Sequence, residues 1–308
     1  MKTGISVIII TYNGAHRISN VLKELIKQSR PADEVIVVID GSKDNTREVV
    51  EKFSGQLPIK IVEIPNRGRS GARNEGVRHS EFDLILYLDD DTRPFTNCIR
   101  EHLQHHSEKP GSIMVGHILE DPALFISDIQ QYRITLYERK GWTRKENGKQ
   151  PLKEEEFFLA SANLSVSRKT FDSLNGFNEI IRDTEDFDFG SRAMAMGIEI
   201  YYMEGYASAY HDDLINCKSF ITRQRQYLKS LENIYKLNPP LYGKYLSALF
   251  TQPSRPKRMV YYFISTNLVV KMIDKEIFKY LLPKKIRYTM YDYIINGLVK
   301  VFPDRQLT

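Results

Sequence analysis

Continuous apolar runs separated by helical patterns are the feature that most restricts the fold of this chain. The β-branched run Ile5–Ile10 is followed by apolar positions at helical spacing. The same alternation continues through three further strand-like runs, at 35–39, 59–64 and 82–88. Uninterrupted apolar strands are typical of a parallel sheet that is buried on both faces. Strand, helix and strand in this order predict right-handed crossovers and a nucleotide-binding type of α/β fold.

Charge divides the chain into two parts. Residues 1–214 hold 27 Lys and Arg against 34 Asp and Glu, a net of −7. Residues 215–308 hold 17 against 5, a net of +12, and their pattern is helical. We therefore expect an acidic mixed α/β body followed by a basic helical extension. Such asymmetry indicates an anionic partner, for which nucleic acid, acidic lipid and a phosphorylated substrate all qualify.

Three absences narrow the class of protein. Two cysteines, Cys98 and Cys217, are too few for a disulfide framework, and we expect both to be buried apolar groups. No apolar run reaches the length of about 18 residues that a membrane-spanning helix needs. The first residues lack the order of a signal peptide, so we expect a cytoplasmic protein.

Three consecutive acids, Asp89, Asp90 and Asp91, end the strand-like run at 82–88. Ligands of open α/β sheets bind at the carboxyl ends of strands. Adjacent carboxylates repel each other unless a positive charge compensates them, and a hard divalent cation does so. The triplet therefore predicts a metal site, with a solvated acidic turn as the alternative.

A second acidic cluster occupies residues 183–188, directly before a helical pattern. Helix capping by Thr184, with acids in the first turn, accounts for one or two of these residues. A second role is proton transfer, because a transferase needs one acidic site for a metal and another for a proton. A glycine-rich stretch at 66–76 adds three arginines, which recognise phosphate well, but matches neither a dinucleotide nor a Walker motif.

In chain order these segments resemble the inverting glycosyltransferases of family 2, which have the GT-A nucleotide-sugar-binding fold. The resemblance spans about residues 4–211 and rests on SVIIITYN (6–13), DGSKDNT (40–46), ARNEG (72–76), LDDD (88–91), TEDFD (184–188) and GIEIYY (197–202). It implies a catalytic domain over 1–214, with a nucleotide-binding half at about 1–120 and an acceptor half at about 121–214. The extension at 215–308 follows it.

The resemblance implies roles for individual residues on the donor side. The residues that match the pocket for the donor's base are Thr11, Tyr12, Asn13 and Asp40. Arg73 matches a nucleotide contact. The family commonly has two acids before the Gly-Ser turn, and here the first is Ile39. Because the second acid, Asp40, is the one that matches the contact with the donor's nucleobase, we expect nucleobase binding to be retained.

The resemblance also implies a metal site of Mg²⁺ or Mn²⁺. Asp89 and Asp90 match residues on the ribose and diphosphate side, and Asp91 matches the main metal ligand. Asp89 and His211 are further candidate ligands.

Asp186 resembles the catalytic base, and Glu185 lies beside it near the acceptor. Removing the acceptor's proton is typically worth about 10²–10⁴-fold in rate. A single carboxylate opposite the leaving group would invert the anomeric centre. The implied enzyme is a metal-dependent hexosyltransferase. It would move a sugar from a nucleoside diphosphate, with UDP favoured, to a glycan or polyprenyl-linked hydroxyl in polysaccharide biosynthesis.

Two other functions stay open. A sugar-1-phosphate nucleotidyltransferase has a similar sheet, but its glycine-rich N-terminal loop is absent from residues 11–16. A catalytically silent, membrane-anchored binding protein would rely on the basic extension instead. Trp142, beside the polar stretch 143–156, is either a stacking residue for an acceptor sugar or an interface or core residue. His102, His105 and His106 lack the companions of a zinc motif, so we expect an exposed helix face.

The basic extension combines positive charge with apolar and aromatic residues over 255–302. Basic amphipathic helices of this kind suit an anionic membrane surface. Packing of the extension on the acidic body is the alternative, and no recognisable module supports a nucleic-acid partner. A peripheral position on the inner face of the cell membrane is therefore an open alternative to a free cytoplasmic one.

Overall fold

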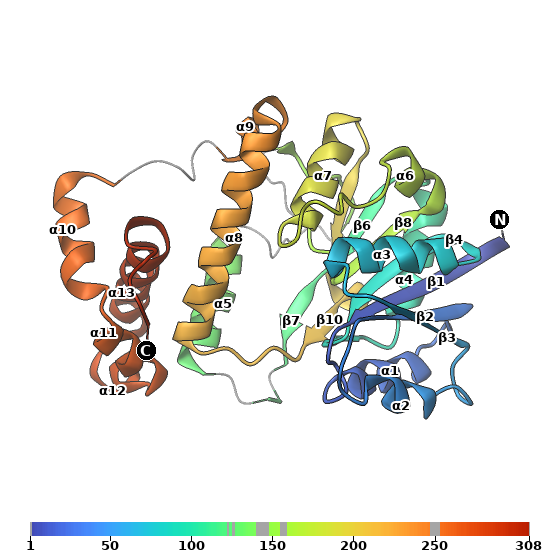
Figure 1. Ribbon diagram of the computed structural model, residues 1–308, viewed down its shortest axis with the longest axis horizontal. Coiled ribbons are helices and arrows are strands. Elements are labelled where there is room, and N and C mark those ends of the chain that lie inside the picture. Colours follow the sequence, from blue (N-terminus) through green and yellow to red (C-terminus); the bar gives the residue numbers. More distant parts are fainter. Residues whose placement is uncertain are drawn as a thin grey trace. The chain divides into compact units, whose positions relative to one another are not determined.

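The computed structural model describes residues 2–121, 123–124, 127–139, 148–154, 159–246 and 253–307 (Figure 1). They form two compact units, one from 1–121 and 141–212 and the other from 122–140 and 213–308. The expected division after residue 214 differs from this grouping in two respects: the boundary falls after residue 212, and 122–140 group with the C-terminal unit. Trp142 lies outside the described residues, as do residues 143–147 and 155–156 of the polar stretch beside it.

A seven-stranded sheet forms the centre of the first unit, in the order β3-β2-β1-β4-β8-β6-β9. Only β8 runs antiparallel to its neighbours, so the predicted mostly parallel sheet is confirmed. The strands are β1 (Lys2–Thr11), β2 (Glu34–Asp40), β3 (Ile59–Ile64), β4 (Phe82–Asp89), β6 (Ile113–Gly116), β8 (Asn163–Ser167) and β9 (Ile200–Met203).

Helices cover both faces of this sheet, which explains why its central strands β1, β2 and β4 are mostly apolar. Ile5, Val7 and Ile9 of β1 pack in one core, whereas Ile8 and Ile10 pack in the other. Figure 1 shows α1 and α2 on one side and α3, α6 and α7 on the other. The helices are α1 (Ile18–Ile26), α2 (Thr46–Glu51), α3 (Gly68–His79), α4 (Cys98–Glu108), α6 (Arg168–Ser173) and α7 (Glu185–Ala195).

A small sheet of β5 (Thr92–Pro94), β10 (Ala209–His211) and β7 (Ile118–Glu120) lies beside the main sheet's carboxyl edge. The apolar stretch at 113–118 is divided between two strands of different sheets, β6 in the main sheet and β7 in the small one. The chain leaves the main sheet after Gly116, where a side chain would collide with Asn163 and the Ala207 carbonyl. The strand β7 then pairs with β10.

The second unit is helical, as predicted. A buried Asp128 in its first helix accepts hydrogen bonds from Arg287 and Tyr291, both at 2.7 Å. No helix in the described part of the chain is long and apolar enough to span a membrane. The elements are α5 (Asp128–Arg139), α8 (Cys217–Leu237), α9 (Pro239–Leu246), α10 (Arg255–Ile264), α11 (Asn267–Asp274), α12 (Ile277–Leu281), α13 (Lys284–Asn296) and a π-helical turn (Gly297–Val301).

Candidate active site

Residues predicted for the site meet where three parallel strands end. Thr11 ends β1, Asp40 ends β2 and Asp89 ends β4, so their carboxyl ends share one edge of the sheet. This is the position where open α/β sheets bind ligands. The loops after β1 and β4 contribute Tyr12, Asn13, Asp90 and Asp91, and the remaining predicted residues come from α3, from the first turn of α7 and from β10.

The three acids after β4 have different partners. Asp89 accepts a hydrogen bond from Arg73 at 2.8 Å. Asp90 is buried, accepts from the Thr11 hydroxyl at 2.6 Å and forms an ion pair with Arg17 at 2.8 Å. Burial raises the pKa of Asp90 to about 6, although Thr11 and Arg17 oppose this shift. Asp90 therefore fixes the end of β1 against the end of β4.

Asp91 faces β10, where its carboxylate lies 3.4 Å from His211 Nε2. The pairing of β5 with β10 sets Thr92 opposite His211 and so determines this distance. Within the described residues, no three His, Cys, Asp or Glu side chains are arranged to hold a metal ion. A carboxylate and an imidazole still fit a divalent cation that takes its other ligands from a diphosphate.

The second acidic cluster lies in the first turn of α7. Glu185 is buried and accepts from Arg73 Nη1 at 2.7 Å, with Arg69 Nε at 3.3 Å. Asp188 is also buried and pairs with Arg192 at 2.7 Å. Glu185 and Asp188 therefore have a structural role in ion pairs, which distinguishes them from Asp186.

Asp186 is the acid of this turn that is only partly buried. Its Oδ1 accepts the backbone amide of Phe187 at 2.7 Å. Burial and the neighbouring Glu185 raise the pKa of Asp186 to about 7, against the opposing charges of Arg69 and Arg73. A carboxyl group whose pKa lies near neutral pH suits a general base.

The arginines that the sequence suggested for phosphate binding contact carboxylates of this unit. Arg67 pairs with Glu179 at 2.6 Å, and Arg69 pairs with Asp183 at 3.1 Å. Arg73 is 1% exposed and joins Asp89 to Glu185. Sequence reasoning missed this link between the two acidic clusters, although Arg69 and Arg73 are four positions apart on α3 and so share a helix face. The direct nucleotide contact of Arg73 stays a prediction.

The predicted pocket for the base surrounds the loop after β1. Tyr12 is 47% exposed there. Asn13 has a left-handed backbone (φ 50°), and its side chain accepts the Lys43 amide at 2.8 Å, which joins two loops at the sheet edge. The Asp40 carboxylate accepts the amides of Arg67 and Gly68 at 2.7 and 2.9 Å. Burial raises the pKa of Asp40 in spite of these bonds. Base binding by this group stays a prediction.

The prediction of an exposed histidine face on α4 is wrong. His102 and His105 are buried. Nδ1 of His102 lies 2.7 Å from the Ser165 hydroxyl, and Nε2 lies 2.9 Å from the amide oxygen of Asn163. The His102 imidazole turns inward because β8 presents the polar side chains of Asn163 and Ser165 to α4. The prediction that Cys98 and Cys217 are buried is confirmed, and burial raises the pKa of both thiols.

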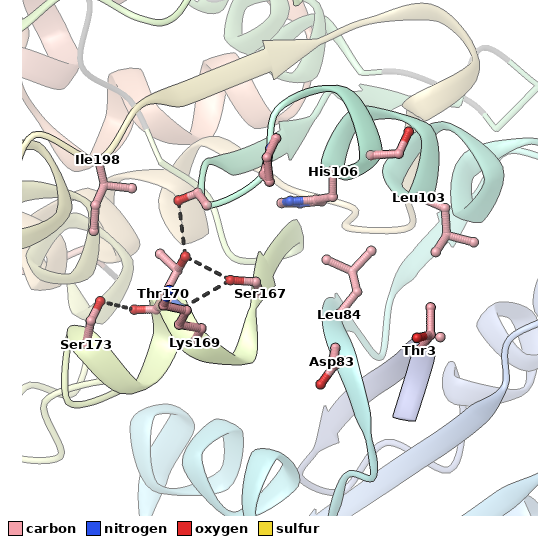
Figure 2. A pocket seen from close by; sticks show the side chains of 14 residues that line it. Thr3, Asp83, Leu84, Leu103, His106, Ser167, Lys169, Thr170, Ser173 and Ile198 are labelled. Carbon is pink, nitrogen blue, oxygen red and sulfur yellow. Dashed lines mark hydrogen bonds between the residues drawn. The ribbon is translucent and has the colours of Figure 1, made fainter. Parts of the chain in front are cut away.

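A cavity of about 680 Å³ lies at the opposite edge of the main sheet (Figure 2). Its lining includes Thr3 at the start of β1, Leu84 near the start of β4, and Leu103 and His106 of α4. Because β1 and β4 carry the predicted site at their other ends, this cavity is not part of it.

Comparison with known proteins identifies the family. Residues 6–174, more than half of the chain, match the family model of glycosyl transferase family 2. The chain belongs to this family. It is 28% identical over 188 residues to the uncharacterized glycosyltransferase YfnE of Bacillus subtilis, a match that covers 59% of this chain and 46% of that protein. It is 33% identical over 90 residues to poly-beta-1,6-N-acetyl-D-glucosamine synthase of Staphylococcus epidermidis, covering 29% and 22%.

The chain thus spans less than half the length of these two curated relatives. Solved structures share its fold at low identity. The mannosyltransferase PcManGT from Pyrobaculum calidifontis, solved with GDP-Man and Mn²⁺, has a TM-score of 0.61 at 17% identity, over 99% of this chain and 89% of that one. S. aureus TarS in complex with UDP-GlcNAc has a TM-score of 0.58 at 16% identity, over 99% and 93%.

Proposed function

We propose that this family 2 protein is an inverting glycosyltransferase that transfers a sugar from a nucleoside diphosphate to a hydroxyl of a glycan or lipid-linked acceptor. One observation carries the proposal: Arg73 joins the acidic end of β4 to the acidic start of α7. Residues suited to hold a diphosphate and a residue suited to take a proton therefore lie on one edge of the sheet. The two structural neighbours solved with UDP-GlcNAc and GDP-Man support a nucleotide-sugar donor.

On the donor side, Tyr12 offers an exposed ring for stacking on the base, and Asp40 offers oxygen acceptors for a ring N–H. UDP is the favoured donor nucleotide. Asp91 and His211 would hold Mg²⁺ or Mn²⁺, with Asp89 as a further ligand, and Mn²⁺ in the mannosyltransferase complex supports such a cation. When bound, the cation neutralises charge on the leaving diphosphate.

On the acceptor side, Asp186 would accept the proton of the attacking hydroxyl. Only one such carboxylate is required, because direct displacement inverts the anomeric centre without a covalent intermediate. Glu185 would orient this turn from its buried position beside Arg73. The partly buried Asp186 remains the group in the turn that can meet an acceptor.

A thermal-shift screen tests donor binding. Nucleoside diphosphates and their sugars, UDP-GlcNAc and GDP-mannose included, are added with and without Mn²⁺, because a ligand of the native state raises its stability. We expect a shift for one nucleotide and slow release of its diphosphate from the sugar form. Absence of any shift would contradict the proposed function, and a shift without turnover would favour a silent binding protein.

An asparagine substitution tests the role of Asp186 as the catalytic base. Asp186→Asn should bind donor as the wild type does but lose transfer to aryl glycosides or polyprenyl-linked sugars, by about 10²-fold or more. The matched control is Asp183→Asn, the same change in the exposed residue three positions earlier. Full transfer by Asp186→Asn would refute the assigned role.

The second unit carries an exposed apolar face that favours a membrane-bound acceptor. On α10, Met259, Tyr262 and Phe263 are 64%, 55% and 70% exposed, and Lys257 and Arg258 on the same helix are exposed as well. An apolar and aromatic face next to basic side chains is typical of helices that lie in an anionic membrane interface. We propose that α10 binds the surface of such a membrane.

Vesicle sedimentation tests this surface. The full chain should bind phosphatidylcholine vesicles that contain phosphatidylglycerol and bind pure phosphatidylcholine far less. Phe263→Ser should release it, whereas Leu237→Ser, an equally drastic change at an exposed residue of α8, should not. If Phe263→Ser binds vesicles as well as the wild type does, the face does not bind the membrane. If light scattering shows a dimer that Phe263→Ser dissociates, the face binds a second copy of the chain instead.

A further inference from the structure

A pocket of about 380 Å³ lies beside the small sheet of the first unit. It is formed by three segments that are far apart in the sequence: α1, the chain from β5 to the start of α4, and the chain from 206 to β10. Its lining includes Glu24, Arg93, Phe95, Asn97, Tyr206 and Tyr210. None of the residues assigned to the donor, the metal or proton transfer is among them.

Aromatic rings form much of the wall. Phe95 and Tyr210 pack with their ring centroids 4.8 Å apart, and the Arg93 guanidinium lies 5.4 Å from the Tyr210 centroid. Tyr206 is 66% exposed. A tyrosine offers a large, rigid face together with a hydroxyl, which suits a ligand that is apolar on one side and polar on the other.

The charges around the pocket disfavour an anionic ligand. Arg93 is held by two carboxylates, Asp121 and Asp212, of which Asp212 lies 2.7 Å from its Nε. Glu24 contributes another carboxylate at the wall. Glu24 pairs with Lys27 at 2.8 Å, so three carboxylates and two cations surround the described pocket, both cations are already compensated, and a phosphate would meet net negative charge. A neutral ligand with many hydroxyl groups would find hydrogen-bonding partners without this penalty.

Strand geometry separates the pocket from the donor site. Tyr210 and His211 are consecutive in β10, and successive side chains of a strand point to opposite faces of the sheet. Tyr210 is paired with Arg93 and His211 with Thr92. The pocket therefore lies on one face of the small sheet, and the Asp91–His211 pair lies on the other.

We propose that this pocket binds a neutral saccharide unit of the acceptor glycan, away from the end that reacts. The apolar C–H face of a pyranose would stack on Tyr206, and its hydroxyls would meet Glu24 and Asn97. Such a second contact raises the local concentration of a polymeric acceptor near the reacting site. The role in transfer rests on the proposed function, whereas saccharide binding itself needs no donor.

An array of immobilised neutral oligosaccharides, α- and β-linked hexoses and N-acetylhexosamines, tests binding by the full chain without nucleotide. We expect the wild type to bind at least one family of glycans. Tyr206→Ala should weaken this binding by about tenfold or more, and Tyr206→Phe should retain it. The matched control is Tyr280→Ala, which truncates a tyrosine that is 82% exposed in the second unit.

Binding of no glycan by the wild type, or equal binding by Tyr206→Ala, would overturn the proposal. The donor-induced thermal shift is measured on the same samples. A normal shift in Tyr206→Ala with lost glycan binding supports a separate saccharide site. A missing shift in the wild type would contradict the proposed function instead, so the two failures can be told apart.

Discussion

Arg73 donates hydrogen bonds to Asp89 and to Glu185, at 2.8 and 2.7 Å, from a position that is 1% exposed. One guanidinium of α3 thus connects the carboxyl end of β4 with the first turn of α7. A buried carboxylate that loses its cation is left with an uncompensated charge, whose cost exceeds the net contribution of the pair. The geometry of the candidate site therefore depends on a residue that need not touch substrate.

Replacing Arg73 by methionine should destabilise the chain by about 3–5 kcal/mol, because Glu185 is 2% exposed and loses its main partner. Chemical denaturation measures this change. Arg78→Met is the matched control on the same helix, since its ion pair with Glu75 involves a side chain that is 54% exposed. An exposed pair of this kind contributes about 0–1 kcal/mol.

A double substitution separates lost charge compensation from lost packing. Adding Glu185→Gln to Arg73→Met removes one stranded carboxylate and should restore part of the stability, so that the two effects are not additive. Additive losses would show that Arg73 acts through packing alone, including its contact with the Phe177 ring at 5.6 Å.

The rate of transfer should fall as pH drops through about 7. Burial and Glu185 raise the pKa of Asp186 to about 7, and only the ionised carboxylate accepts a proton. Because Arg69 opposes this shift, Arg69→Gln should raise the pKa further and move the acidic limb to higher pH. The measurement is the initial transfer rate against pH at saturating donor. An unchanged limb in Arg69→Gln would assign the titration to another group.

Stability should also decrease in mild acid, because of the histidines of α4. Burial lowers the pKa of His102 to about 3 and of His105 to about 4, whereas an unfolded histidine titrates near 6.5. The unfolded chain therefore binds protons first. Stability is fully present above about pH 6.5 and is lost as pH falls toward 4, by up to about 1.4 kcal/mol per pH unit for each histidine.

Denaturation midpoints of wild type and His102→Gln between about pH 7 and pH 5 test this linkage. The variant should start less stable, having lost two buried contacts, but show a shallower decline with acid. Leu103→Ala, a destabilising change at the next residue, should keep the wild-type slope. Equal slopes in all three proteins would contradict the assignment.

The long strands of the main sheet could be predicted from the sequence, because each one depends on an apolar pattern within its own residues. The runs at 5–10, 35–39, 59–64 and 82–88 became β1 to β4 within a few residues. Burial on both faces requires mostly apolar residues in the central strands, whereas the edge strand β3 keeps Lys60 and Glu63 exposed. The three-residue strands β5, β7 and β10 were missed, because they are too short for any period to be recognised. The pairing that sets His211 against Asp91 joins residues 120 positions apart and left no local signal.

Long-range charge pairing explains the other differences. The sequence showed acids at 89–91 and 185–188 and arginines at 67–73, but not that the arginines compensate the acids. Asp128 belongs to α5, and its partners Arg287 and Tyr291 belong to α13, so only the folded chain reveals why 122–140 group with the C-terminal unit.

The contact between Asp91 and His211 leads to the last prediction. If both hold a divalent cation against a diphosphate, Asp91→Asn and His211→Gln should each lose the part of the donor-induced thermal shift that depends on Mn²⁺. A ligand at 100 times its Kd stabilises by about 2.7 kcal/mol, so weaker binding reduces the shift measurably. The nucleotide's own, metal-independent shift should remain, because Tyr12 and Asp40 are untouched. His79→Gln, at a histidine that pairs with Glu75 on α3, is the control and should keep the Mn²⁺-dependent part. A full Mn²⁺ response in Asp91→Asn would place the cation elsewhere.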